Sequence, residues 1–294
     1  MSRATSRGKA SVRAVCEAFS ISRQAYYAAR RATPSERSER RGASPRATIA
    51  TAALLERIRA VVVRCAAWGV RKVWAYLRHI EKVVVSRRRV WKVMKAHGLV
   101  LPASGPERRE SPPRGQVVVP TSNRRWATDL TTQATSREGV VAIVPVVDCG
   151  DRVALAIEIT KSQEAPAVLR PVARALENAF EDPRDVPDGL ELRTDHGPQY
   201  TGADAEALCA RWRILHTFAP VARPTGNAVA ERFIQTLKVE LLWTRDWESI
   251  EELRTAIAEW VVRYNEERPH QSLGWRTPAE QRSLNLNQPT KRAA

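Results

Sequence analysis

The sequence lacks the closely spaced cysteines and histidines that hold zinc or form a redox pair. Its four cysteines and five histidines are scattered over 294 residues, and no two cysteines form a C-x-x-C pair. We therefore expect the thiols to be buried and reduced. Runs of about 18 uncharged apolar residues are also absent, which predicts that no segment spans a membrane. The basic start has no apolar segment of a secretory signal. Together these absences favour a cytoplasmic protein.

Acidic residues are scarce in the first part of the chain. Residues 1–125 contain 28 Lys and Arg against 7 Asp and Glu, a net charge of +21 (28 − 7), whereas residues 126–294 contain 20 against 25, a net charge of −5. The two sum to the formal net charge of +16. A basic front on a mildly acidic body favours a polyanion-binding arm, although a solvated basic surface would give the same count.

Two segments rich in Ser, Arg, Pro and Gly, 32–50 and 101–124, divide the chain. The domain prediction that follows has five parts: a basic helical N-terminal segment with a linker (1–48), a helix-turn-helix-like unit (49–100), a second linker (101–123), a catalytic core (124–282) and a basic tail (283–294).

The third helix expected in the unit 49–100 has a basic side. Ser86 is a candidate N-cap and Gly98 a candidate residue just past the C-terminus of this helix. Arg88, Lys92 and Lys95 share one face at i, i+4 and i+7. Such a stripe is typical of a recognition helix in the major groove of DNA, and also of an ordinary solvated helix face.

After residue 124 the pattern changes to strands. Residues 124–134, 139–148 and 151–160 read as strands, and a helix (162–180), a strand (190–194), a helix (201–212), a strand (214–219) and two helices (227–243 and 249–265) follow. We expect Pro171 near the first turn or at a kink, and Thr201 as a helix cap. The order predicts a mixed α/β sheet with flanking helices, preceded by an all-α DNA-binding region.

Three acids stand at exposed ends or faces of these elements. Asp129 lies in the first strand, Asp195 follows the strand 190–194, and Glu231 shares a helix face with Gln235 and Lys238. Singly, each has an ordinary explanation: a turn-forming Asp or a solvated position. Together, three carboxylates would repel one another unless divalent cations neutralise them. Oxygen ligands suit Mg²⁺ or Mn²⁺, and two such ions fit a phosphodiester substrate.

Three blocks of sequence resemble the DDE-type transposase and retroviral-integrase superfamily: "RRWATDLTT", "LRTDHGPQYTG" and "PTGNAVAERFIQTLKVE". Between Asp195 and Glu231 lie 35 residues (231 − 195 − 1), and between Asp129 and Asp195 lie 65 (195 − 129 − 1). The segment "YNEERPHQSLGWRTPAE" (264–280) is similar to the family's C-terminal block. The likeness is greatest to the second-frame protein of insertion sequences of family three.

This resemblance implies a ribonuclease-H-like core, a Mg-dependent polynucleotidyl transferase, and DNA cleavage and strand transfer during transposition. It also implies that Asp129, Asp195 and Glu231 bind two metal ions and that Lys238 contacts DNA. DNA, a second copy of the chain and a first-frame protein, separate or fused by frameshift, are the expected partners, in a bacterial cytoplasm at the nucleoid.

The remaining candidate residues are less specific. Arg232, Gln235 and His196 could reach DNA or simply be solvated. Tryptophans 126, 212, 243, 247 and 260 are expected in the core rather than as platforms for bases. Two other functions stay open: a ribonuclease-H-like nuclease, and a catalytically inactive, element-derived DNA-binding regulator.

Overall fold

The computed structural model describes residues 49–102, 119–220 and 226–287, together with Val12, Cys16 and Ser22. Ile49–Ala294 forms one compact unit. Apart from these three residues, the predicted helical segment 1–48 lies outside the described residues, as do most of the linker 101–123 and the end of the predicted basic tail. The domain boundaries therefore stay a prediction.

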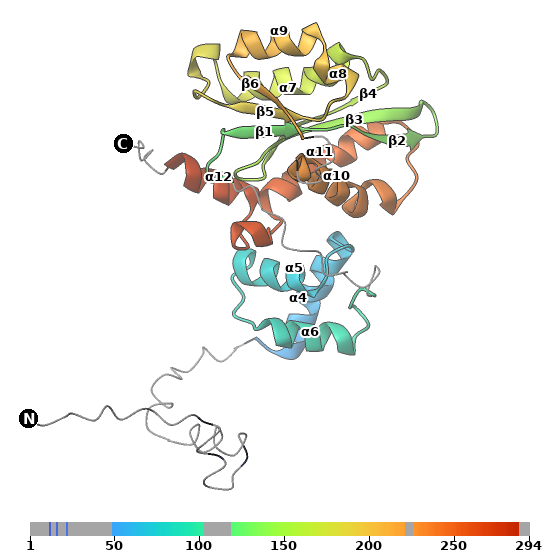
Figure 1. Cartoon of the computed structure of the whole chain (residues 1–294). Coiled ribbons are helices and arrows are strands. Elements are labelled where there is room, and N and C mark those ends of the chain that lie inside the picture. The colour runs from blue at the N-terminus through green and yellow to red at the C-terminus, as the bar shows by residue number, and fades with distance from the viewer. Residues whose placement is uncertain are drawn as a thin grey trace, which may run out of the picture. The chain divides into compact units, whose positions relative to one another are not determined.

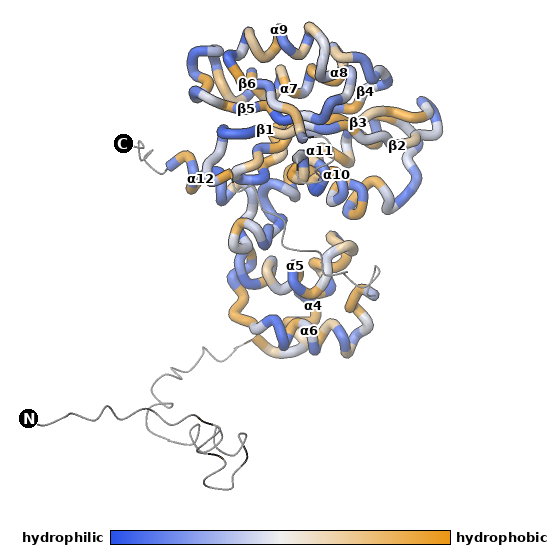
Figure 2. The backbone as a smooth tube through the Cα atoms, in the orientation of Figure 1, coloured by the Kyte–Doolittle hydropathy of each residue, from blue (hydrophilic) through white to orange (hydrophobic). Residues whose placement is uncertain are grey.

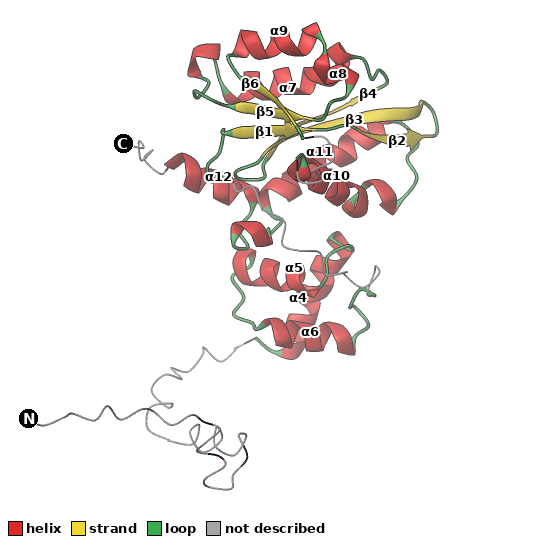
Figure 3. Cartoon of the chain, viewed as in Figure 1, coloured by secondary structure: helices red, strands yellow, loops and turns green. Residues whose placement is uncertain are grey.

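Residues 49–102 form the predicted helical unit (Figure 3). Its core gathers apolar residues at helical spacing, with Leu54, Val90 and Met94 fully buried. Ser86 caps the third helix, because its Oγ accepts a hydrogen bond from the Arg89 N–H at 3.3 Å. Gly98 ends it with φ +66°. The helices are α4 (Thr51–Arg64), α5 (Val70–Ala75) with a π-helical turn η1 (Tyr76–Ile80), and α6 (Arg87–Ala96).

The core contains a six-stranded mixed sheet (Figure 1). The long, apolar β3 pairs antiparallel with β1, β2 and β4, while β1, β5 and β6 run parallel to one another. Much of β3 is hydrophobic in Figure 2, as expected of a strand buried on both faces. The strands are β1 (Arg125–Thr128), β2 (Thr131–Thr135), β3 (Gly139–Asp148), β4 (Ala154–Thr160), β5 (Glu191–Thr194) and β6 (Leu215–Phe218).

The predicted strand 124–134 is interrupted. β1 pairs Thr128 with Val146, β2 pairs Thr131 with Ile143, and both pairs have the same register sum (128 + 146 = 131 + 143 = 274). The two strands therefore continue one line along β3, with a gap at residues 129–130. In this gap Asp129 Oδ1 accepts a hydrogen bond from the Leu130 N–H at 2.8 Å, so the side chain takes a donor that a ladder would use.

Helices cover both faces of the sheet (Figure 1). One face carries α7 (Ala165–Ala179), α8 (Pro198–Thr201) and α9 (Ala203–Trp212), and the other α10 (Ala228–Glu240) and α11 (Ile250–Glu266). A further helix, α12 (Pro278–Asn287), packs on α11; it was not predicted and runs past residue 282. Short 3₁₀ turns lie at η2 (Pro183–Asp185), η3 (Leu242–Thr244) and η4 (Gln271–Leu273).

One local prediction is wrong, and another is wrong in part. Thr201 ends α8 instead of capping the next helix, whose N-cap is Gly202 without a side-chain hydrogen bond. Pro198 explains the difference, because it starts a helical turn before the expected cap. Pro171 lies past the first turn of α7, which begins at Ala165, so the first of its two predicted places is wrong, and the kink stays a prediction.

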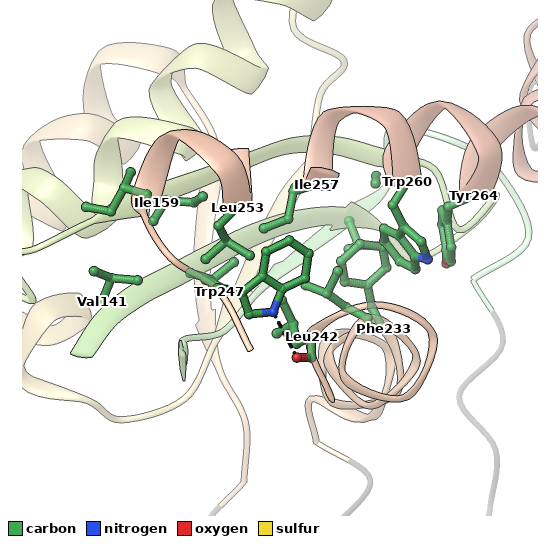
Figure 4. Close-up of a cluster of buried hydrophobic side chains, with 14 residues drawn as sticks. Val141, Ile159, Phe233, Leu242, Trp247, Leu253, Ile257, Trp260 and Tyr264 are labelled. Carbon is green, nitrogen blue, oxygen red and sulfur yellow. Dashed lines mark hydrogen bonds between the residues drawn. The ribbon is translucent and has the colours of Figure 1, made fainter. Parts of the chain in front are cut away.

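Aromatic packing fixes α10 against α11 (Figure 4). The ring of Phe233 meets Trp260 edge-on at 5.6 Å and Tyr264 at 4.9 Å between centroids. Trp247 donates a hydrogen bond from Nε1 to the Leu242 carbonyl at 3.0 Å. This packing directs the apolar side of α10 towards the core and leaves its polar side facing outward. The expected burial is confirmed for tryptophans 126, 212, 247 and 260.

Trp243 is the exception among these tryptophans. Its side chain is 63% exposed, so its expected place in the core is wrong. It follows α10 in the turn η3, where Leu242 takes the inward position instead.

All four cysteines are free and buried, as expected. In the described ranges no helix is long and apolar enough to cross a membrane.

Charged contacts tie the helical unit to the core. The Lys72 ammonium of α5 lies 2.6 Å from Glu240, the last residue of α10, and Arg268 contacts the same carboxylate at 3.1 Å. Arg64 pairs with Glu267 at 2.5 Å. The Glu240 side chain is only 9% exposed, so its two cationic partners offset the loss of hydration.

A second buried network anchors α12. The carboxylates of Asp148 and Asp151 are fully buried, and Arg282 Nη1 reaches them at 3.4 and 3.0 Å. Burial and the neighbouring Asp151 charge raise the pKa of Asp148 to about 6. One guanidinium therefore compensates two buried acids.

Candidate active site

Asp129 and Asp195 occupy equivalent places on neighbouring parallel strands. β1 and β5 pair with a constant offset, Arg125 with Glu191 and Ala127 with Arg193, a difference of 66 (191 − 125). The two acids have the same offset (195 − 129 = 66), so each comes directly after the carboxyl end of its strand. Because side chains alternate along a strand, both belong to the face that α10 covers.

The turn after β5 orients Asp195. Its Oδ1 accepts a hydrogen bond from the Gly197 N–H at 3.0 Å, and Pro198 then starts α8. The carboxylate is half-buried. It is therefore held at its base by the strand and the turn while its other oxygen accepts no hydrogen bond from the described residues.

Asn227 places the helix that carries Glu231. Its buried side chain donates from Nδ2 to the Thr128 carbonyl at 3.0 Å, directly before Asp129. The Glu231 N–H in turn donates to the Asn227 carbonyl at 3.1 Å, in the first turn of α10. No role was predicted for Asn227. An Asn at a helix start is a visible cap signal, but its partner on another strand is not visible.

The three carboxylates influence one another electrostatically. Burial raises the pKa of Asp129, and the charges of Asp195 and then Glu231 raise it further, against the Leu130 N–H and the Lys238 ammonium, which lower it. Among the described residues, no three His, Cys, Asp or Glu side chains are close enough to hold a metal ion as they stand. Glu231 is exposed and has the smaller effect on Asp129, so its side chain would have to turn inward to join a ligand set.

The donor chemistry of this group suits a hard divalent cation. All three side chains offer carboxylate oxygens. Burial, and after it the charges of Asp195 and Glu231, raise the pKa of Asp129, and a cation bound to these oxygens would offset both effects. Within the described chain no His or Cys side chain completes a softer site with them.

The three residues of α10 that were predicted to contact DNA differ in their surroundings. Lys238 is half-buried with its ammonium 5.8 Å from the ring centroid of Trp243, and it is near enough to act on Asp129. Gln235 is exposed. Arg232 is exposed too, and it lines a cavity of about 780 Å³ that none of the three acids lines.

The His196 side chain is exposed, but it makes contacts within the protein. Its Nε2 donates to the Ala219 carbonyl at 3.0 Å, and its ring stacks on Phe218 at 4.9 Å between centroids. One ring nitrogen is therefore already used within the protein.

The stripe on α6 faces solvent. Arg88, Lys92 and Lys95 are all exposed, opposite the buried Val90 and Met94. The Lys95 ammonium lies 5.2 Å from the ring centroid of Trp91, which is itself 40% exposed. This face offers three cations and an aromatic ring, the combination that suits a nucleic-acid backbone.

Three family models match the chain: an HTH-like domain at residues 50–106, and the integrase core domain at residues 120–224 and again at 213–278. The chain is 30% identical over 242 residues to the transposase InsD of insertion element IS2A/D/F/H/I/K from Escherichia coli, covering 77% of each protein. It matches the InsD of the IS2 copy on the F plasmid of Escherichia coli equally well.

Among solved structures, the intasome of simian T-cell lymphotropic virus in complex with the PP2A regulatory subunit B56 gamma is similar at a TM-score of 0.51 and 15% identity. The match covers 81% of this chain and 78% of that one. At this identity the likeness concerns the fold alone.

Proposed function

Because this chain belongs to the transposases of bacterial insertion elements that have an integrase core, we propose that Asp129, Asp195 and Glu231 are its catalytic acids. The chain acts in DNA transposition as a polynucleotidyl transferase. One observation carries the assignment of the acids: Asp129 and Asp195 follow paired strands at one register offset, and Asn227 ties the helix of Glu231 to the same strand end.

The three acids would hold Mg²⁺ or Mn²⁺, two ions in all. When bound, such ions withdraw charge from the phosphodiester oxygens and lower the pKa of an attacking water. The residues of the chain supply the geometry. The Gly197 N–H fixes the Asp195 carboxylate, the Leu130 N–H fixes that of Asp129, and α10 brings Glu231 to the same face of the sheet.

Two reactions follow on the bound DNA. Water adds to the phosphorus of the phosphodiester at the element end, and the bond to the 3′ oxygen breaks, leaving a 3′-hydroxyl and a 5′-phosphate. The 3′-hydroxyl then adds in line to a target phosphodiester, and the target's own 3′ oxygen leaves as a hydroxyl. No covalent bond to the protein forms, so no Ser or Tyr nucleophile is required.

We assign the DNA contacts to two groups of cations and polar residues. Near the acids, Lys238, Gln235, Arg232 and His196 would contact the backbone of the reacting strand. On the helical unit, α6 would enter the major groove and present Arg88, Lys92 and Lys95. The net charge of −5 on residues 126–294 makes the front of the chain the main source of electrostatic affinity.

Two copies of the chain would act together, since two element ends must be joined in one event. A first-frame protein, separate or fused by frameshift, would supplement DNA binding. The complex would work in the bacterial cytoplasm, at the nucleoid. Size measurement of the protein with and without a labelled element end would separate a constitutive oligomer from one that DNA assembles.

Replacing the stripe on α6 should weaken DNA binding and flatten its salt dependence. With Arg88, Lys92 and Lys95 all changed to Gln, the slope of log affinity against log salt should decrease by about 2.7, since each phosphate contact contributes about 0.9. A filter-binding or anisotropy titration over several salt concentrations measures this slope. The same changes at Lys161, Arg174 and Arg211, which are exposed on the core, should leave it nearly unchanged. An equal loss in both variants would show that only net charge matters.

The reaction products separate transposition from the other functions. We expect the protein, incubated with Mg²⁺, a labelled element end and a target plasmid, to yield joined molecules as well as cut ones. A nuclease with the same core would give cut products alone, and a DNA-binding regulator would give neither. The assay therefore assigns one of three outcomes to one of three functions.

A further inference from the structure

The cavity of about 780 Å³ beside α10 is strongly cationic. Seven of the described residues that line it are Arg or Lys, and none of them is Asp or Glu. It lies within the compact unit Ile49–Ala294. Its volume falls within the roughly 300–1,000 Å³ typical of sites for small organic ligands. A cavity with this lining is suited to an anionic ligand of nucleotide size.

The protein's own acids do not neutralise this lining. Arg125 and Arg193 share one carboxylate, Glu191, at 2.6 and 3.5 Å. Lys72 and Arg268 likewise share Glu240. The other three lining cations make no ion pair with any described residue. Seven cations against two acids leave an excess of five positive charges (7 − 2), and the three lining cations without an ion pair are Arg71, Arg152 and Arg232.

Further polar groups in the wall lack partners. Arg193 Nε is buried and has no hydrogen-bond partner among the described residues, and neither has Asn227 Oδ1. Asn227 is 5% exposed and stands at the start of α10, which receives no side-chain cap. The first N–H groups of this 13-residue helix thus add a positive end to the same wall. A buried donor and a buried acceptor left unsatisfied would both be met by a ligand with phosphate and hydroxyl groups.

His270 shows how positive the surroundings are. Burial lowers its pKa well below the ordinary value, and the charges of Arg268, Lys72 and Arg152 lower it further. The neutral ring nitrogen lies 3.0 Å from Arg268 Nη1 and accepts its hydrogen bond. The imidazole therefore adds no charge, and the field at the cavity comes from the guanidinium and ammonium groups.

The cavity also has an aromatic side. Trp275 lines it, half-buried, with φ +72°, a backbone conformation rare for a bulky residue. Such strain persists where the surrounding structure demands it, and it gathers at binding sites. A planar ring beside a cluster of arginines is the pairing that recognises a base together with its phosphates.

We propose that this cavity binds a nucleotide, with its phosphates on the arginines and α10 N-terminus and its base near Trp275. The nucleotide has two possible sources with the same chemistry: one unit of a DNA strand led past the acids, or a free nucleoside di- or triphosphate. Binding of a DNA strand in the cavity rests on the proposed function, whereas binding of a free nucleotide does not. Two lining residues bring the cavity next to the proposed catalytic acids. Arg193 lies two residues before Asp195, and Asn227 is hydrogen-bonded to the carbonyl of Thr128, the residue before Asp129.

Calorimetric titration of the full chain with ATP, in buffer containing EDTA, tests the proposal without any metal at the acids. Changing Arg71 and Arg152 to Gln should weaken ATP binding at least about tenfold, since each lost charge-assisted hydrogen bond is worth roughly that factor. Changing the exposed Arg174 and Arg211 to Gln is the matched control and should alter affinity less than about twofold. Matching thermal transitions of the two variants exclude unfolding.

Other ligands identify what is recognised. Inorganic pyrophosphate should bind more weakly than ATP, because it has no base to meet Trp275. Displacement of ATP by a short single-stranded oligonucleotide assigns the cavity to a DNA strand, and failure to displace it assigns the cavity to a free nucleotide.

Three results would overturn the proposal: no binding of ATP or oligonucleotide at the cavity, equal affinities in the two arginine variants, or equal affinities for pyrophosphate and ATP. The variant Asp195→Asn keeps the test separate from the proposed catalysis. It should bind ATP like the native chain whether or not Asp195 is a catalytic acid.

Discussion

Changing Asp195 to Asn should lower strand transfer by at least about a hundredfold and leave DNA binding intact. Loss of one preorganised charge at a reacting centre typically costs this much. Asn keeps the shape of the side chain, and its oxygen can still accept the Gly197 N–H that orients Asp195. What it loses is the negative charge that a divalent cation requires. The measurement is the yield of joined product from a labelled element end and a target plasmid.

Asp204 provides the matched control for this change. It is an exposed acid nine residues further along (204 − 195), in the first turn of α9. Asp204→Asn should retain strand transfer within about a factor of two, since solvated surface positions tolerate such changes. Near-native joining by Asp195→Asn would remove Asp195 from the catalytic centre. Loss of DNA binding in the same variant would point instead to a folding defect.

Replacing Arg282 with Met should destabilise the protein by about 3–5 kcal/mol near neutral pH, the usual consequence of leaving buried charges without their partner. The guanidinium of Arg282 is the cation that faces both Asp148 and Asp151, which are fully buried. Urea unfolding of the two proteins at about pH 7.5 measures the difference.

The loss should be smaller at about pH 5. The folded-state pKa of Asp148, about 6, is above its ordinary value of 3.8, so the folded protein takes up a proton more readily than the unfolded chain. Stability linked to Asp148 therefore rises as the pH falls from 6 towards 4. Without Arg282, which lowers this pKa, the same gain should begin at a higher pH. An equal loss at both pH values would contradict this account.

Two further variants check that charge is responsible. Arg276→Met removes an exposed arginine that precedes α12 and donates from Nη1 to Gln281 of that helix, and it should cost less than about 0.5 kcal/mol. Asp148→Asn combined with Arg282→Met removes one of the two uncompensated charges and should recover part of the lost stability.

The alternation of polar and apolar residues was enough to predict most of the helices and strands in the core, but not the helices α8 and α12. It was also enough to place Asp195 at a strand end, since "LELRT" is followed by a turn that no strand continues. The break between β1 and β2 was not predictable in this way. Thr128, Asp129 and Leu130 all fit a strand, and the interruption depends on a side-chain hydrogen bond that competes with the ladder.

Residues that act through tertiary contacts were missed for a related reason. Asn227 bonds to a strand 99 positions earlier in the chain, and no local pattern records such a partner. Arg125 and Arg193 alternate with apolar neighbours as surface residues do, and they become part of one cationic wall only when β1 and β5 pair. Trp243 was assigned to the core by residue type, but its position after the end of α10 exposes it.

The gap at Asp129–Leu130 leaves Asp129 outside the strand pairing that holds the sheet together. β3 pairs with β1 before the gap and with β2 after it. The residue at position 129 therefore contributes little to the stability of the sheet. A copy of the protein without this carboxylate should therefore keep its fold and, under the proposed function, the cations that contact DNA. Under the proposed function, such a copy would bind the same element ends without cutting them, so inactivated copies of the gene would inhibit transposition by intact ones.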